Sequence, residues 1–103
     1  MNELFTQFDS TFFEKNRMSI LMVLHRQGSA SYNQFKALLG LPDGSLYNHM
    51  EKLSLNGYIE KRKEIAGATV QTVYSLAEKG RNQVIEYLQF MEALLKSHQE
   101  EKL

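Results

Sequence analysis

The chain has no cysteine among its 103 residues, and it has no long run of apolar side chains. Without cysteine, neither disulfide bonds nor thiolate metal sites can form, which favours a reducing environment. No segment approaches the roughly 20 consecutive apolar residues that a membrane-spanning helix needs. The amino terminus, which carries Glu3 and Asp9, lacks the basic and then apolar order of a secretion signal. We therefore expect a cytoplasmic protein without a membrane partner.

Motifs of the common enzyme classes are also missing. The sequence has no glycine-rich phosphate loop and no candidate nucleophile with a base in its sequence context. The three histidines, His25, His49 and His98, do not have the spacing of metal ligands. We therefore expect no enzymatic activity, no metal site and no cofactor.

The chain has no net charge, because 12 basic side chains balance 12 acidic ones. Their distribution is uneven. Residues 17–63 carry seven basic and three acidic side chains, a net charge of +4, whereas residues 1–16 and 64–103 each carry −2. A basic middle between acidic ends favours one binding face for a polyanion on a molecule that otherwise repels it.

The first part of the chain predicts two helices in a single small domain. Leu4, Phe5, Phe8 and Phe12 recur at helical spacing and predict an amphipathic helix within residues 1–16. From Arg17 onward, a second helix is apolar on most sides, as a central core helix should be, and Gly28 ends it.

Two short helices are predicted next. Ser31 and Gln34 have the spacing of a capping box, in which each side chain bonds the backbone amide of the other residue, and Gly40 closes this helix. Pro42 fixes the backbone for the first turn of the following helix, and Asp43 can cap its free amides. Two helices joined by so short a connection predict a helix-turn-helix.

The sequence next predicts two strands, residues 58–65 and 70–76, joined by a loop of small residues. A last helix is predicted from about Glu78 to Ser97. The apolar face of that helix is too wide for one small domain to cover, which predicts a two-fold dimer. In the alternative, the N-terminal phenylalanines cover this face within the same chain. The expected interface residues are Leu4, Phe5, Phe8, Phe12, Val84, Leu88, Met91 and Leu95.

The order of these elements resembles the small winged-helix transcriptional regulators of bacteria and archaea, the broad MarR/ArsR-like group. The most specific part of the likeness runs from Asp43 to Ile59, and residues 74–81 resemble the second wing strand and the start of the last helix. The resemblance implies a mainly α fold with a two-stranded β wing, a winged helix-turn-helix with a long C-terminal dimerisation helix. Residues 1–103 then form one domain, with an N-terminal helix (1–16), a winged-helix core (17–76), a dimerisation helix (77–97) and a tail (98–103).

Members of this group are mostly dimeric DNA-binding repressors or activators, so the resemblance implies double-stranded DNA as the partner. On the predicted recognition helix, Leu46, Met50 and Leu53 share the buried face at helical spacing. On the opposite half, Asn48 can make a bidentate contact to adenine, and Lys52 suits guanine or a phosphate. The wing tip departs from the group's pattern because it carries no cation. The expected DNA-contacting residues are Tyr32, Gly44, Ser45, Tyr47, Asn48, Lys52, Lys61, Arg62, Lys63, Thr69 and Gln71.

We therefore predict a homodimeric transcriptional regulator that binds a pseudo-palindromic operator. Any small-molecule effector is expected to bind in the dimer cleft and to change the separation of the two recognition helices. The competing hypothesis is a winged-helix protein–protein interaction module without specific DNA binding, which the neutral net charge and the uncharged wing tip favour. The basic middle segment distinguishes the two, because an interaction module would not need it.

Overall fold

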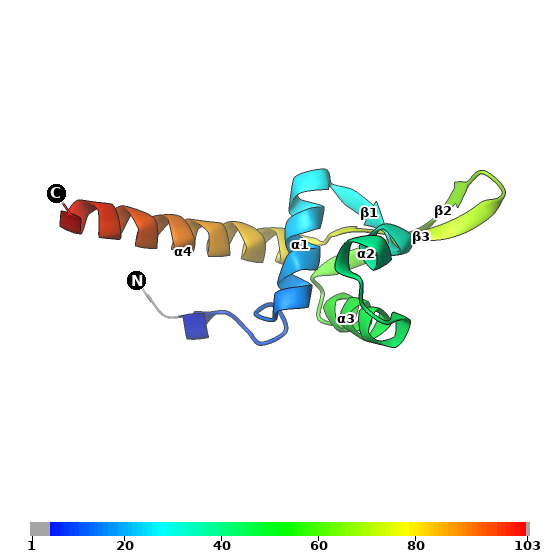
Figure 1. The fold of residues 1–103 in the computed structure, drawn as a ribbon, viewed down its shortest axis with the longest axis horizontal. Coiled ribbons are helices and arrows are strands. Elements are labelled where there is room, and N and C mark those ends of the chain that lie inside the picture. The colour runs from blue at the N-terminus through cyan, green and yellow to red at the C-terminus, as the bar shows by residue number, and fades with distance from the viewer. Residues whose placement is uncertain (1–4, 103) are drawn as a thin grey trace.

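The computed structural model describes residues 5–102, with side-chain detail over residues 5–97. Three helices form the body: α1 (Lys15–Gln27), α2 (Tyr32–Leu39) and α3 (Asp43–Leu55). A hairpin of β2 (Ile59–Ala66) and β3 (Thr69–Leu76) extends from one end of the body as the wing, and α4 (Glu78–Lys102) extends from the other end (Figure 1). The predicted winged helix-turn-helix is therefore confirmed.

The predicted N-terminal helix is wrong. Within the described residues before α1, only Phe5–Gln7 forms a helix, the 3-10 helix η1, and a single turn follows it, closed by the 3.0 Å bond from the Phe13 amide to the Asp9 carbonyl. The Asp9 carboxylate accepts hydrogen bonds from the amides of Thr11 (2.8 Å) and Phe12 (3.0 Å). In a continuous helix these amides would instead bond the carbonyl groups of the preceding turn, so Asp9 stops the helix and bends the chain.

Helix α1 begins before the predicted position. Glu14 is its N-cap, with a side chain that accepts a 2.8 Å hydrogen bond from the Arg17 amide, so the helix starts at Lys15. The expected boundary at residue 16 therefore falls inside a helix. The predicted end is confirmed, because Gly28 lies after the last helical residue with φ of 89°.

The sheet has three strands where two were predicted. Strand β1 (Ser29–Ser31) pairs with β3 in antiparallel register, with Ala30 opposite Tyr74, and the strand order β1-β3-β2 makes β3 the central strand. Three residues show too little alternation to be recognised in a sequence. Residues 29–31 form a strand because they follow the end of α1 directly and lie beside the edge of β3 that β2 leaves unpaired.

The helix-turn-helix has the predicted capping box. The Ser31 hydroxyl accepts from the Gln34 amide at 3.1 Å, and the Gln34 side chain accepts from the Ser31 amide at 2.7 Å. Gly40 ends α2 in the left-handed conformation, with φ of 63°. The predicted cap of α3 is wrong, because Pro42 holds the N-cap position without a side-chain hydrogen bond. The Asp43 carboxylate pairs with Lys36 instead, at 3.0 Å.

The core lies where α1, α3 and the sheet meet the first turns of α4. It contains Ile20, Leu24, Phe35, Leu46, Met50, Leu53, Tyr58 and Val84, each nearly or completely buried. Helix α4 enters this core at Gly80, where a Cβ atom would lie 2.0 Å from the carbonyl oxygen of Tyr58. A glycine is therefore required at this contact between α4 and the residue before β2.

Helix α4 is longer than predicted, because residues 98–102, expected as a tail, continue it to Lys102. Its second half projects away from the body, and the N-terminal segment lies beside its first half, where Phe5 and Phe8 contact Phe90 (Figure 1). The molecule is accordingly elongated, with principal extents of 59, 25 and 23 Å. Within the described residues, no helix is both long and apolar enough to cross a membrane.

Candidate nucleic-acid interface

The outer face of α3 carries the side chains that sequence analysis assigned to base contact. Leu46, Met50 and Leu53 are buried and fix the rotation of the helix about its axis. That rotation leaves Asn48 and Lys52 exposed. Lys52 forms no ion pair with any described side chain, so its charge is free. This face can present an amide and a cation to the edges of base pairs.

The same rotation exposes Gly44 and Tyr47, while Ser45 is half-buried at the flank. A Cβ atom at Gly44 would meet nothing within 4 Å, so the start of α3 has open space in front of it. Tyr32, expected to contact DNA, is half-buried at the start of α2. Its hydroxyl donates a 3.2 Å hydrogen bond to the Asp43 carbonyl, which joins the two helices of the helix-turn-helix.

A groove of about 560 Å³ lies between α3 and the wing. Lys61 and Lys63 share one face of β2, because alternate residues of a strand lie on the same side. Burial raises the pKa of Tyr74 to about 12, with further contributions from Tyr32 and Glu51, so its hydroxyl stays protonated. The groove is lined by Tyr32, Tyr47, Glu51, Lys61, Arg62, Lys63, Thr72 and Tyr74.

Three cations on this side of the molecule are already paired with carboxylates. Lys61 Nζ lies 2.9 Å from Glu51 Oε2, which raises the pKa of Lys61. Arg62 lies 2.7 Å from Glu64, and Lys36 lies 3.0 Å from Asp43. Lys63 donates a 2.6 Å hydrogen bond to the Thr72 hydroxyl and forms no ion pair with a described residue. Three of the seven cations of residues 17–63 are therefore paired with carboxylates, and one of these carboxylates, Glu64, lies outside that segment.

The wing tip is apolar as well as uncharged. Ile65 and Val70 face each other across the hairpin, and both are exposed. The hydroxyl of Thr69 donates to the Ala66 carbonyl at 2.9 Å, so it stabilises the turn, and Gln71 is half-buried. The apolar pair was not expected from the sequence, although two β-branched residues on either side of the Ala66–Thr69 turn were the available signal.

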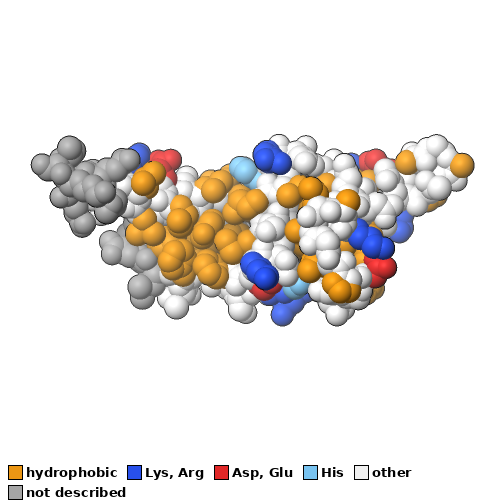
Figure 2. All heavy atoms as spheres, in the orientation of Figure 1, with side chains coloured by type: hydrophobic (Ala, Val, Ile, Leu, Met, Phe, Trp, Pro, Cys, Tyr) orange, Lys and Arg blue, Asp and Glu red, His pale blue; other side chains and the backbone are white. Residues whose placement is uncertain are grey.

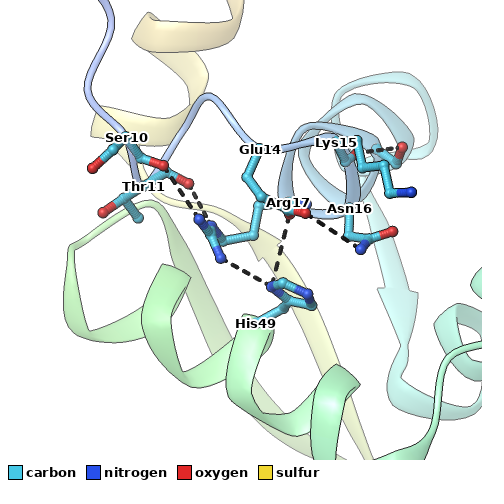
Figure 3. Close-up of polar contacts among 8 residues, drawn as sticks. Ser10, Thr11, Glu14, Lys15, Asn16, Arg17 and His49 are labelled. Carbon is cyan, nitrogen blue, oxygen red and sulfur yellow. Dashed lines mark hydrogen bonds and ion pairs between the residues drawn. The ribbon is translucent and has the colours of Figure 1, made fainter.

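Arg17 does not belong to the basic surface. Its side chain is buried, and its guanidinium donates to the carbonyl groups of Thr11 (2.6 Å) and Ser10 (3.2 Å). A third contact reaches Nδ1 of His49 on α3 at 3.0 Å (Figure 3). His49 therefore points toward the N-terminal segment and away from the outer face of α3.

Glu14 completes this cluster, with Oε1 at 3.8 Å from His49 Nδ1 (Figure 3). Partial burial opposes its charge, but hydrogen bonds from the Arg17 and Asn16 amides outweigh burial and hold the pKa of Glu14 below its usual value. The cluster thus joins the segment before α1 to the recognition helix. Among the described residues, no group of three or more potential ligands could hold a metal ion.

A second surface is formed by apolar side chains of α4 and the N-terminal segment. Figure 2 shows these hydrophobic side chains gathered over the part of the molecule where the two segments lie together. Of the expected interface residues, Phe5, Leu88, Met91 and Leu95 are exposed here. Phe13, Ile85 and Leu94 are exposed on the same two segments, and of these only Phe13 was not expected on an apolar face from the sequence. We call these seven residues the apolar patch.

Three other expected interface residues are in the core of the single chain. Phe8, Phe12 and Val84 are buried, and the rings of Phe8 and Phe12 contact Tyr87 of α4. The N-terminal segment therefore covers the first half of α4 within one chain, and these three side chains are not available to a partner. Leu4 lies outside the described residues.

Comparison with known proteins places the chain in a family. A family model described as a winged helix DNA-binding domain matches residues 16–95. Protein MJ0432 of Methanocaldococcus jannaschii is 34% identical over 77 residues, which are 71% of this chain and 84% of the relative.

Two solved structures have a similar fold. A transcriptional regulator homologue from Pyrococcus horikoshii is 26% identical, with a TM-score of 0.78 over 94% of this chain and 97% of the other. The transcriptional regulator HlyU from Vibrio vulnificus is 25% identical, with a TM-score of 0.63 over 77% of this chain and 78% of the other. The chain therefore belongs to the family of winged-helix DNA-binding domains, and it is a winged-helix regulator.

Proposed function

We propose that the protein acts as a homodimer on a pseudo-palindromic operator and controls transcription by occupying it, without catalysis. Each protomer inserts α3 in the major groove, and its wing follows the flanking backbone. The observation that carries this proposal is the position of the free Lys52 and Asn48 on the outer face of α3, next to a groove lined by three cations of β2. In this arrangement α3 would contact the edges of the bases, and the groove beside it would bind the adjacent sugar-phosphate backbone.

The dimer part of the proposal rests on the apolar patch. Its side chains are between about one third and three fifths exposed, which is unfavourable for a free monomer in water. The projecting half of α4 offers a long contact surface for a second copy, and a two-fold axis would bring the same residues of both protomers together. The two recognition helices would then reach half-sites about 34–36 Å apart, or a multiple of that distance.

Any effector in this proposal binds in the cleft between the α4 helices and the helix-turn-helix of the dimer. It would act by favouring one separation of the two α3 helices over another. Only the separation that matches the half-sites allows both helices to contact DNA at once.

Binding to random-sequence duplex DNA over a series of salt concentrations tests the DNA part of the proposal. Phosphate neutralisation releases counterions, so log K should fall linearly with log salt. Lys52→Gln should reduce the slope by about one unit for each protomer that loses a phosphate contact. Lys96→Gln is the matched control, because it removes the same charge from α4, where the Lys96 amine pairs with Glu92.

A flat response down to low salt, in the wild type and in both variants, would contradict the proposal. The protein–protein interaction module would then be the better hypothesis. The ion pairs of Lys36, Lys61 and Arg62 favour that alternative, because a surface that neutralises its own cations attracts phosphate weakly.

A further inference from the structure

Among the described residues that line the groove between α3 and the wing, Glu51 is the only acidic one. Its neighbours there are three cations of β2 and the phenol groups of three tyrosines. All of these can donate hydrogen bonds to an anion. In this structure the groove therefore already holds one anion of the chain itself, the carboxylate of Glu51.

The Glu51 carboxylate is held at a specific position in the groove. It accepts a 2.9 Å hydrogen bond from Lys61 Nζ, and its side chain is only 30% exposed. Because Glu51 belongs to α3 and Lys61 to β2, this ion pair bridges the two elements that are proposed to contact DNA. A phosphate that enters the groove from solvent meets the same amine.

The other ion pairs on this side are arranged differently. Arg62 and Glu64 are two residues apart on one strand, and Lys36 pairs with Asp43 at the start of α3. Neither Glu64 nor Asp43 lines the groove, and the Asp43 side chain is 66% exposed. Solvent screens such exposed pairs strongly. The Lys61–Glu51 pair is therefore the one placed to compete directly with a phosphate.

We propose that Glu51 is an internal competitor of the DNA backbone: its carboxylate occupies Lys61, and a phosphodiester must displace it before the groove can bind DNA. This inference rests on the proposed function. Displacement costs the free energy of the ion pair whatever the base sequence is, so Glu51 lowers the affinity for all duplex DNA. Base contacts by α3 must then supply more of the affinity, which favours the operator over the rest of the genome.

Replacing Glu51 by Gln tests the inference, since the amide has the size of the carboxylate and lacks its charge. With random-sequence duplex DNA as the probe, affinity should rise about two- to thirtyfold, the range expected for loss of one partly exposed ion pair in each of two protomers. The salt slope should steepen by up to about one unit per protomer, because no carboxylate takes up a cation when Lys61 turns to the phosphate. Glu51→Ala should change both quantities in the same direction.

Glu92→Gln is the matched control for net charge. It also removes one carboxylate from an ion pair, the 3.0 Å contact to Lys96 on α4, which is away from the groove. Its effect on DNA affinity should be below twofold, because screening weakens a charge that lies beyond about one Debye length from the DNA. Thermal unfolding of each variant establishes that the folded fraction is the same in every binding measurement.

A second comparison uses the Lys61→Gln background. Without the amine there is nothing for Glu51 to occupy, so adding Glu51→Gln should raise affinity much less than it does in the wild type. An undiminished gain in that background would overturn the inference, because Glu51 would then act by general repulsion of DNA. A gain from Glu51→Gln no larger than that from Glu92→Gln would overturn it as well. DNA binding by none of the variants would overturn the proposed function and this inference together.

Discussion

Tyr58 donates a 2.5 Å hydrogen bond to the Asp9 carboxylate, a contact between residues 49 positions apart in the chain. Tyr58 lies in the turn that leads from α3 to β2, and its ring also packs against Phe12 and below the amine of Lys79. Burial and the bond to Asp9 raise the pKa of Tyr58 well above its usual range, so it remains a donor. One residue thus holds the N-terminal segment, the start of the wing and the start of α4 together.

Loss of this bond should lower stability in a pH-dependent way. Partial burial opposes the charge of Asp9, but bonds from Tyr58, Phe12 and Thr11 outweigh it and hold the pKa of Asp9 below its usual value. The stabilisation is therefore fully present above the unfolded pKa, near 3.9, and is lost as pH falls through the lower folded pKa. We expect Asp9→Asn to reduce the free energy of unfolding by about 1 kcal/mol at pH 7.

Urea unfolding of the wild type and Asp9→Asn at pH 7, 4 and 3 checks this prediction. The difference between the two proteins should shrink toward the acid end. Tyr58→Phe removes the same bond without removing the charge, so it serves as the control for the hydroxyl. A difference that stays constant over this range would mean that ionised Asp9 is not the source of the stabilisation.

Glycine at position 80 should be essential for stability. A Cβ atom there would lie 2.0 Å from the Tyr58 carbonyl oxygen, which also accepts a 3.0 Å hydrogen bond from the Ala77 amide. Because the clashing atom is backbone, α4 must shift, and we expect Gly80→Ala to cost about 3 kcal/mol. Gly44→Ala is the control: it faces open space at the start of a helix, so it should raise stability by up to about 1 kcal/mol.

Melting temperatures of both glycine variants provide the measurement. If Gly80→Ala melts at the same temperature as the wild type, the close approach of α4 to Tyr58 is wrong. The direction in which α4 leaves the body would then need a different physical cause.

The proposed dimer should dissociate when its apolar patch is charged. Leu88→Glu combined with Met91→Glu places two carboxylates on the exposed side of α4, where a dimer would bury them without partners. Light scattering at micromolar concentration should then report a folded monomer instead of a dimer. Leu38→Glu with Leu55→Glu is the matched control, since both leucines are exposed on the helix-turn-helix, away from the patch. A wild-type protein that is monomeric under these conditions would disprove the interface.

Base reading and backbone contact should separate at Asn48 and Lys63. With an operator selected from a random-sequence library, Asn48→Ala should cost about 1–3 kcal/mol and relax preference at one base pair per half-site. Lys63 is the groove cation that can reach a phosphate without breaking an ion pair, because within the described part of the chain its amine bonds the Thr72 hydroxyl and no carboxylate. Lys63→Ala should weaken operator and random DNA alike and lower the salt slope by about one unit per protomer.

The two variants serve as controls for each other in binding measurements on operator and random DNA. Equal losses on both DNAs for Asn48→Ala would remove Asn48 from the base-reading set. An unchanged salt slope for Lys63→Ala would mean that the groove does not contact phosphate.

Local sequence signals were sufficient for the helix-turn-helix and the wing. The capping box of Ser31 and Gln34 and the left-handed Gly40 depend on residues within a few positions of each other, and both were predicted correctly. The buried side of α3 followed from Leu46, Met50 and Leu53, because helical periodicity alone decides which residues share a face. The same periodicity placed Asn48 and Lys52 on the outer side.

The N-terminal segment shows where periodicity fails. Phe5, Phe8 and Phe12 have helical spacing, yet Asp9 takes the amides that a helix would need and the segment bends instead. The same spacing therefore occurs in a helix and in this bent segment of turns, whose rings meet one surface. The rings of Phe8 and Phe12 became core because α4 arrives from far along the chain to pack against them.

By itself, the sequence determined the helices of the helix-turn-helix, the hairpin and the buried face of α3, because these depend on neighbours within one or two turns. Only the tertiary structure decided which charges are free to act. The Arg17 guanidinium is hydrogen-bonded to backbone carbonyls and His49, and the Lys61 amine is paired with Glu51. Lys52 and Lys63 have no carboxylate partner in the described part of the chain. The sequence gives only the net charge of a segment. The attraction of each cation for DNA depends on which partners the fold places within a few ångströms of it.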